Sequence, residues 1–120
     1  MLEASSASRP VVLVRKNEHQ IIRGRKKLPI GLALGDKREY KTEKLPFKKG
    51  DSIYMLTDGY CDQFGGKDNE KFMAERFLNL LVSMQGLSMA DQGAELENVI
   101  EEWKGKRKQL DDILVVGFRL

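Results

Sequence analysis

Two acidic motifs that lie far apart in the sequence carry the residues best suited to chemistry. Asp58 follows a short apolar run at residues 53–56 and precedes Gly59, a residue type that lets the backbone turn sharply. Near the C-terminus, Asp111-Asp112 stands directly before a second apolar run at residues 113–116. One predicted strand therefore ends in an acid, and another begins with two.

The two motifs converge if their strands are antiparallel neighbours, because the end of the first strand then meets the start of the second. Neighbouring carboxylates repel one another unless a cation neutralises them, and carboxylate oxygens suit hard divalent cations such as Mg2+ or Mn2+. The alternative is that Asp58 only accepts hydrogen bonds from a turn or from the start of a helix. The residues alone leave both interpretations open.

The composition limits the classes of protein and of site. A chain of 120 residues with 41% hydrophobic and 32% charged residues indicates one globular domain. Its single cysteine, Cys61, permits no internal disulfide, which favours the cytoplasm, and we expect it to be a small packing residue. A single histidine, His19, excludes a multi-histidine zinc site. No apolar run is long enough to span a bilayer, so we expect a soluble protein without membrane contact.

The basic residues give a net charge of +3 and are concentrated in three runs, at residues 23–27, 48–49 and 104–108. Such runs could bind a phosphate backbone. However, no aromatic residues alternate with them and no nucleic-acid motif accompanies them. We therefore expect solvated basic faces and no nucleic-acid partner.

The N-terminal half is predicted to be rich in strands. A hairpin is expected from strands at residues 11–14 and 20–23, with His19 exposed near its tip. A loop at residues 26–35 and a polar strand at about residues 38–44 follow. The central strand at residues 53–56 comes next.

The C-terminal half is predicted to contain two helices and a last strand at residues 113–120. Asn69 is expected to cap the first helix and Gly86 to end it. Ser88 is expected to cap the second helix and Gly105 to end it. The predicted inner faces consist of Met73, Phe77, Leu80, Leu81 and Met84 in the first helix and of Leu96, Val99, Ile100 and Trp103 in the second. This order predicts an α+β fold in which a helical hairpin packs on one face of a mostly antiparallel sheet.

Taken in order, six motifs resemble the C-terminal part of the metal-dependent (PPM, type 2C-like) protein serine/threonine phosphatases, in the bacterial branch that is like stage II sporulation protein E. These motifs are Pro29-Ile30-Gly31-Leu32, Lys49-Gly50-Asp51, Thr57-Asp58-Gly59-Tyr60, residues 62–66, Trp103-Lys104-Gly105 and residues 109–113. The resemblance covers essentially the whole chain, 1–120, as a single domain. It implies an incomplete α-β-β-α phosphatase sandwich.

The resemblance also implies a reaction and a set of site residues. The complete domain would hydrolyse phosphomonoesters of serine and threonine by means of a hydroxide that bridges two Mn2+ or Mg2+ ions. Asp58 and Asp111 would then be metal ligands, with Gly59 and Asp112 near the metal site. No side-chain nucleophile would be needed. The partner would be a phosphoprotein of a bacterial signalling pathway, such as the antagonist of an anti-sigma factor.

Family members carry further acidic ligands upstream, on an early strand and in an Asp-Gly-x-Gly turn, and this chain begins after both. We therefore expect the chain alone to bind metal weakly or not at all and to be inactive, whereas the parent protein would be the enzyme. Incomplete sheets would expose strand edges, so a homodimer formed through these edges or by element swapping is expected. The alternative function is a non-catalytic protein-protein interaction module derived from this fold.

Overall fold

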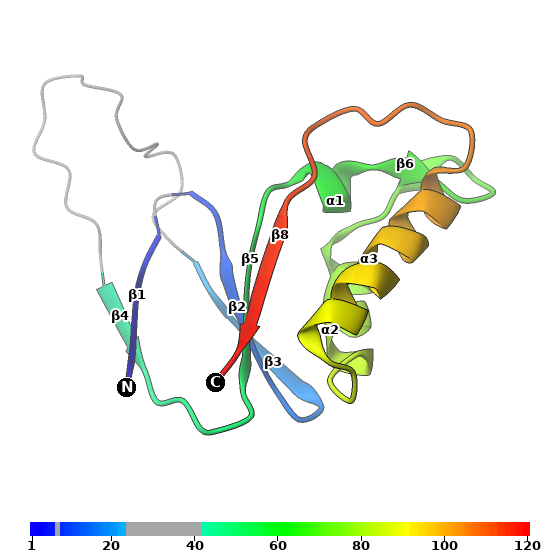
Figure 1. Ribbon diagram of the computed structural model, residues 1–120. Coiled ribbons are helices and arrows are strands. Elements are labelled where there is room, and N and C mark those ends of the chain that lie inside the picture. Colours follow the sequence, from blue (N-terminus) through cyan, green and yellow to red (C-terminus); the bar gives the residue numbers. More distant parts are fainter. Residues whose placement is uncertain (7, 24–41) are drawn as a thin grey trace, which may run out of the picture.

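The central element of the fold is a four-stranded antiparallel sheet in the order β3-β2-β5-β8. The computed structural model describes residues 1–6, 8–23 and 42–120 (Figure 1). Two helices, α2 and α3, cover one face of this sheet (Figure 1), which confirms the predicted α+β arrangement. The bounds of these elements are Val11–Arg15 for β2, Glu18–Ile22 for β3, Ser52–Leu56 for β5, Val115–Arg119 for β8, Ala74–Ser83 for α2 and Met89–Lys104 for α3.

Smaller elements complete the described part of the chain. Strand β1 (Leu2–Ser5) pairs with β4 (Thr42–Leu45), and this pair lies on the side of the sheet away from the helices (Figure 1). The short helix α1 (Gly59–Asp62) directly follows β5. Strands β6 (Phe64–Gly65) and β7 (Glu70–Lys71) form a two-residue ladder before α2.

The core lies between the sheet and the two helices. Its buried members include aliphatic and aromatic side chains from both the sheet and the helices: Val12, Val14, Tyr54, Tyr60, Phe77, Leu81, Leu96 and Ile100. The Tyr54 hydroxyl donates to Gln92 Oε1 (2.6 Å) and accepts from Gln85 Nε2 (2.8 Å). The Tyr60 hydroxyl donates to the carbonyl of Leu96 (2.7 Å). The polar ends of the buried tyrosines are therefore hydrogen-bonded, as burial requires.

Several local predictions are confirmed. Strands β2 and β3 form the expected hairpin, in which His19 is exposed and pairs with Val14. The Ser88 hydroxyl accepts a hydrogen bond from the backbone nitrogen of Asp91 (3.1 Å) and so caps α3. Gly105, at a φ of 58°, ends α3. The capping pattern therefore predicted both ends of this helix.

The predicted start of the first helix is wrong. Asn69 caps no helix, because it lies in the turn between β6 and β7 at a φ of 50°. Helix α2 begins only at Ala74, and Met73, predicted to be buried, is 54% exposed. Phe72, whose backbone nitrogen donates to the carbonyl of Gln63, is buried instead. The loop predicted at residues 26–35 and the first residues of the predicted polar strand lie outside the described residues.

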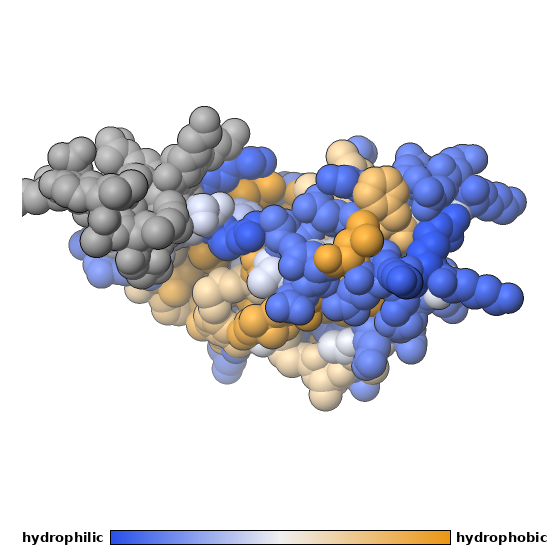
Figure 2. All heavy atoms as spheres, turned by 90° about the horizontal axis from the view of Figure 1, so that it is seen from above, coloured by the Kyte–Doolittle hydropathy of each residue, from blue (hydrophilic) through white to orange (hydrophobic). Residues whose placement is uncertain are grey.

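The face of the sheet opposite the helices is partly open. Leu114, Val116 and Phe118 are 57%, 43% and 37% exposed, and Met55 on the neighbouring strand is 43% exposed. Apolar surface is also visible among the charged groups when the molecule is seen from above (Figure 2). An apolar sheet face of this kind normally packs against another layer.

Candidate metal site

The adjoining ends of β5 and β8 bring the two acidic motifs together. The strands are antiparallel, and Leu56 at the end of β5 pairs with Val115 at the start of β8. Beyond this pair, the backbone nitrogen of Thr57 donates to the carbonyl of Leu114 (3.0 Å). The Thr57 hydroxyl donates to the carbonyl of Asp112 (2.8 Å) and accepts from the backbone nitrogen of Leu114 (3.0 Å). The predicted antiparallel pairing is confirmed.

Gly59 allows the closest approach between the two motifs. A Cβ atom at this position would lie 2.3 Å from the carbonyl oxygen and 2.8 Å from the carbonyl carbon of Asp112. Both atoms belong to the backbone, so neither can move aside as a flexible side chain would. Glycine at position 59 is therefore required by space.

Asp58 lies at the N-terminus of α1, with its side chain 43% exposed, and forms an ion pair with Arg9 (Nη1 to Oδ2, 2.7 Å). The hydrogen bond from Arg9 is the main reason that the pKa of Asp58 is below its ordinary value, while partial burial acts in the opposite direction. The nearby Asp111 side chain contributes a smaller lowering of the Asp58 pKa. The segments that carry Asp58 and Asp111 thus adjoin at the ends of β5 and β8.

The Asp111-Asp112 turn is exposed and held by local hydrogen bonds. Asp111 Oδ1 accepts from the backbone nitrogen of Asp112 (2.7 Å), and the Asp111 carbonyl accepts from Gln109 Nε2 (2.9 Å). Asp112 contacts the β5 end through its backbone carbonyl. This backbone carbonyl lies against Thr57 and Gly59.

The donor set fits part of a divalent-cation site. Two carboxylates at one sheet end are hard oxygen donors, but a Mg2+ ion takes about six oxygen ligands. Among residues 1–6, 8–23 and 42–120, no group of three or more histidine, cysteine or acidic residues is placed to hold a metal ion. A hollow of about 460 Å³ adjoins Thr57, between the segment that contains Arg9 and the open faces of β5 and β8. The described residues therefore supply no more than two carboxylates to one such site.

Cys61 is not an alternative nucleophile. It packs against the core, and burial raises the pKa of its thiol to about 11. Because the thiolate is the reactive form, this cysteine is largely protonated near neutral pH. Its predicted role as a packing residue is confirmed.

Arg9 is the site residue that sequence reasoning missed. The signal lies in the strand register: Val11 pairs with Met55 in the antiparallel β2-β5 ladder, so residues before Val11 run alongside residues after Met55. Extending this register places Arg9 opposite Thr57, one residue before Asp58, and its side chain reaches the Asp58 carboxylate. The apolar runs alone do not determine that register.

The fold is that of part of a PP2C-like phosphatase domain. The SiaA-PP2C domain of Pseudomonas aeruginosa matches with a TM-score of 0.84 and 26% identity, over 95% of this chain and 44% of that chain. The PP2C phosphatase domain of the cell fate determinant SpoIIE from Bacillus subtilis, solved with a fragment of its regulatory domain, matches in fold with a TM-score of 0.63 and 24% identity. That match covers 98% of this chain and 33% of that chain.

The family follows from the sequence model of stage II sporulation protein E (SpoIIE), which matches residues 1–120. The chain belongs to this family, and the resemblance to the C-terminal part of a PP2C-like phosphatase domain is confirmed. The chain spans less than half the length of the two solved chains. No curated protein sequence matches it. Within the described part of the chain, no helix has the length and apolar character needed to cross a membrane.

Proposed function

We propose that this chain is part of the catalytic domain of a metal-dependent serine/threonine protein phosphatase and that Asp58 and Asp111 are metal ligands in it. The observation that carries the proposal is the convergence of these acids at the adjoining ends of β5 and β8. It occurs in a chain whose family and fold are PP2C-like. Two acids that were far apart in sequence are thus available to one cation pocket.

Two Mn2+ or Mg2+ ions bound there would activate water for attack on a phosphomonoester and neutralise the charge of the phosphoryl oxygens. The chain's own residues place the oxygen donors. Thr57 holds the Asp112 carbonyl, and Gly59 leaves room for it, so the turn that carries Asp111 stays against the end of β5. Asp112 serves this positioning.

The remaining ligands would come from the rest of a complete domain. The solved SiaA domain is more than twice as long as the part that this chain matches, and the exposed sheet face of Leu114, Val116 and Phe118 is suited to packing against a further layer. We therefore expect the chain alone to be inactive. The proposed substrate is a phosphoserine or phosphothreonine on a bacterial signalling protein in the cytoplasm.

The test is a hybrid domain in which this chain replaces the matching part of the Pseudomonas aeruginosa SiaA-PP2C domain. With Mn2+, the hybrid is expected to hydrolyse a chromogenic phosphomonoester, and Asp58→Asn and Asp111→Asn are each expected to reduce turnover by about 100-fold or more. Asp62→Asn is the matched control, because Asp62 is a nearby acid that pairs with Lys71 instead. A folded hybrid whose turnover is unaffected by both ligand substitutions contradicts the proposal.

The second candidate is a non-catalytic interaction module derived from this fold. It is favoured by one observation: the Asp58 carboxylate is already neutralised by Arg9 at 2.7 Å. A folded hybrid that is inert toward phosphomonoesters and unchanged by Asp58→Asn would support this candidate.

A further inference from the structure

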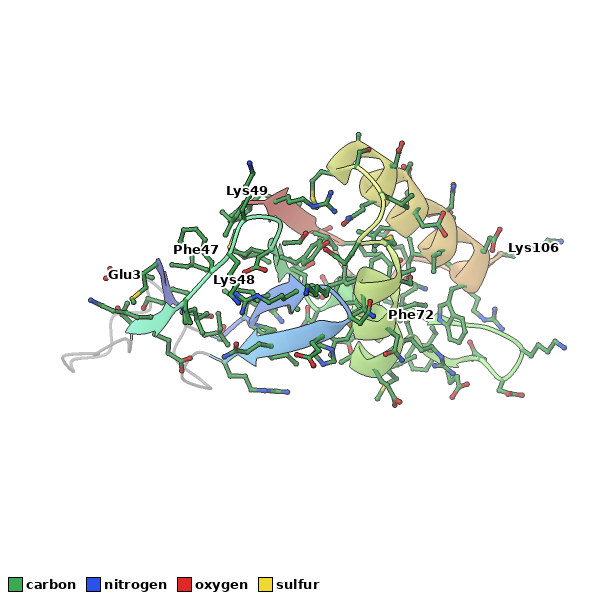
Figure 3. All side chains as sticks on the ribbon, turned by 90° about the horizontal axis from the view of Figure 1, so that it is seen from below. Glu3, Phe47, Lys48, Lys49, Phe72 and Lys106 are labelled. Carbon is green, nitrogen blue, oxygen red and sulfur yellow. The ribbon has the colours of Figure 1, made fainter. Side chains whose placement is uncertain are left out.

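A second hollow lies at the opposite end of β5 from Asp58. It has a volume of about 610 Å³ and lies between the tip of the β2-β3 hairpin and the loop that precedes β5. Four basic residues line it: Arg15, Lys16, Lys48 and Lys49. Figure 3 shows Lys48 and Lys49 on the loop, near the hairpin and far from Lys106. The volume falls within the range of ligand pockets, and the lining is strongly cationic.

The carboxylate in the floor of this hollow does not offset the lysines. Asp51 is only 2% exposed and accepts hydrogen bonds from Arg15 Nε (2.9 Å), from Arg15 Nη2 (2.5 Å) and from the backbone nitrogen of Lys48 (2.7 Å). These bonds, led by those from Arg15, hold the pKa of Asp51 below its ordinary value. Arg15 and Asp51 therefore neutralise each other within the protein.

The three lysines remain available to a ligand. Lys16, Lys48 and Lys49 are exposed and form no ion pair with any described residue. Apart from Asp51, the lining contains one other acid, Glu18, so its net charge is positive. Such a concentration of unpaired positive charge attracts and orients anionic partners.

The loop that carries two of these lysines is held in place. The backbone nitrogen of Gly50 donates to the carbonyl of Leu120 (2.7 Å), and the backbone nitrogen of Leu120 donates to the carbonyl of Asp51 (2.9 Å). Together with the Lys48 to Asp51 hydrogen bond, these contacts anchor the loop to β8 and to the floor of the hollow. The loop backbone that carries Lys48 and Lys49 is therefore fixed before a ligand binds, which reduces the entropy cost of ordering this loop.

We propose that this hollow binds an acidic peptide segment of a protein partner, one that carries several aspartate or glutamate side chains. Among the described residues, no aromatic side chain lines the hollow, so it lacks the stacking groups with which proteins hold the bases of single-stranded nucleic acids. The hollow is separated from Asp58 by the length of β5, about 20 Å for seven residues. It is thus a separate docking site, and its existence does not depend on the metal site.

The test measures binding of a fluorescein-labelled octaglutamate peptide to the chain by fluorescence anisotropy at low ionic strength. The double variant Lys48→Glu/Lys49→Glu is expected to weaken binding by about tenfold or more. The matched control is Lys106→Glu/Lys108→Glu, which makes the same change in net charge at two exposed positions outside the lining of the hollow. Figure 3 shows Lys106 far from Lys48 and Lys49. The control variant is expected to lower the affinity for octaglutamate by less than about twofold, because it reduces the net positive charge of the chain but not the charge of the hollow.

Three results would overturn the proposal. The first is an absence of saturable octaglutamate binding. The second is an equal loss in the two double variants, which would indicate attraction to net charge alone. The third is tighter binding of an oligothymidylate of equal charge that is lost in Lys48→Glu/Lys49→Glu, which would assign the hollow to nucleic acid. Circular dichroism of each variant must match the parent chain, and an Asn17→Asp variant, which adds one negative charge within the lining, must also weaken binding.

Discussion

Replacing Gly59 by alanine is expected to destabilise the chain and to separate the two acidic motifs. The new Cβ would lie 2.3 Å from the Asp112 carbonyl oxygen, whereas an ordinary contact begins at 3.4 Å, so the Asp112 turn must move by about 1 Å. Overpacking of this kind costs about 1–3 kcal/mol. Loss of the hydrogen bond from the Thr57 hydroxyl to Asp112 adds about 1 kcal/mol. The unfolding free energy should therefore fall by about 2–4 kcal/mol.

Urea unfolding followed by circular dichroism measures this change. A loss of about 2–4 kcal/mol lowers the urea midpoint by roughly 1–2 M for a domain of this size. Gly93→Ala is the matched control, because Gly93 is exposed within α3 and a Cβ there meets nothing within 4 Å. Alanine at that position should stabilise the helix by about 0.5–1 kcal/mol. Equal urea midpoints for the parent and Gly59→Ala would refute the close packing at position 59.

Three further predictions concern the core, the buried ion pair and the open sheet. Tyr54→Phe should lower the unfolding free energy by about 1–3 kcal/mol, because Gln85 and Gln92 lose the Tyr54 hydroxyl as a buried hydrogen-bond partner. An unchanged midpoint in urea unfolding would count against these two hydrogen bonds. The pKa of Asp51 is below 3.8 in the folded chain, so the unfolded chain binds this proton first as the pH falls. The stabilisation from the Arg15–Asp51 ion pair is therefore present above about pH 5 and is lost as the pH falls toward the lowered pKa of Asp51. Over this pH range, Asp51→Asn should lose less unfolding free energy than the parent chain. Parallel profiles of unfolding free energy against pH for the two chains would contradict the lowered pKa of Asp51. The chain should self-associate through its edge strand β8, and light scattering should report a molar mass above that of the monomer. Val116→Lys, at an exposed position of β8, should shift the chain toward the monomer. A parent chain that stays monomeric over a wide concentration range would exclude this contact.

The core of the candidate site could be predicted from the sequence because it depends on local signals. Asp58 and Asp111 each adjoin an apolar run, and antiparallel pairing of two such strands requires their adjoining ends to meet. The ends of α3 could also be predicted from local signals, because Ser88 and Gly105 act within one turn of the helix. Predictions of this type need only the identity and spacing of neighbouring residues.

Other features depend on contacts that local patterns do not contain. Helical spacing included Met73 in the first helix, but Phe72 takes the buried place after the β6-β7 ladder. The need for glycine at position 65 also comes from a residue far away in the sequence, because a Cβ there would lie 2.0 Å from the carbonyl oxygen of Trp103. Arg9 reaches Asp58 only through the register of β2 against β5. The burial of Phe72, the need for glycine at position 65 and the Arg9–Asp58 ion pair all depend on tertiary packing, which the sequence pattern alone does not determine.

The most direct test of the central claim is a titration of the chain with Mn2+, followed by paramagnetic broadening of backbone amide signals in NMR. If Asp58 and Asp111 form part of a cation site, the signals of Gly59 and Asp112 should broaden first, at roughly millimolar Mn2+, and the Asp58→Asn/Asp111→Asn variant should lose this effect. Asp62→Asn should retain it, because Asp62 pairs with Lys71. Broadening that is centred elsewhere, or that persists unchanged in the double variant, would contradict the assignment of these two acids as metal ligands.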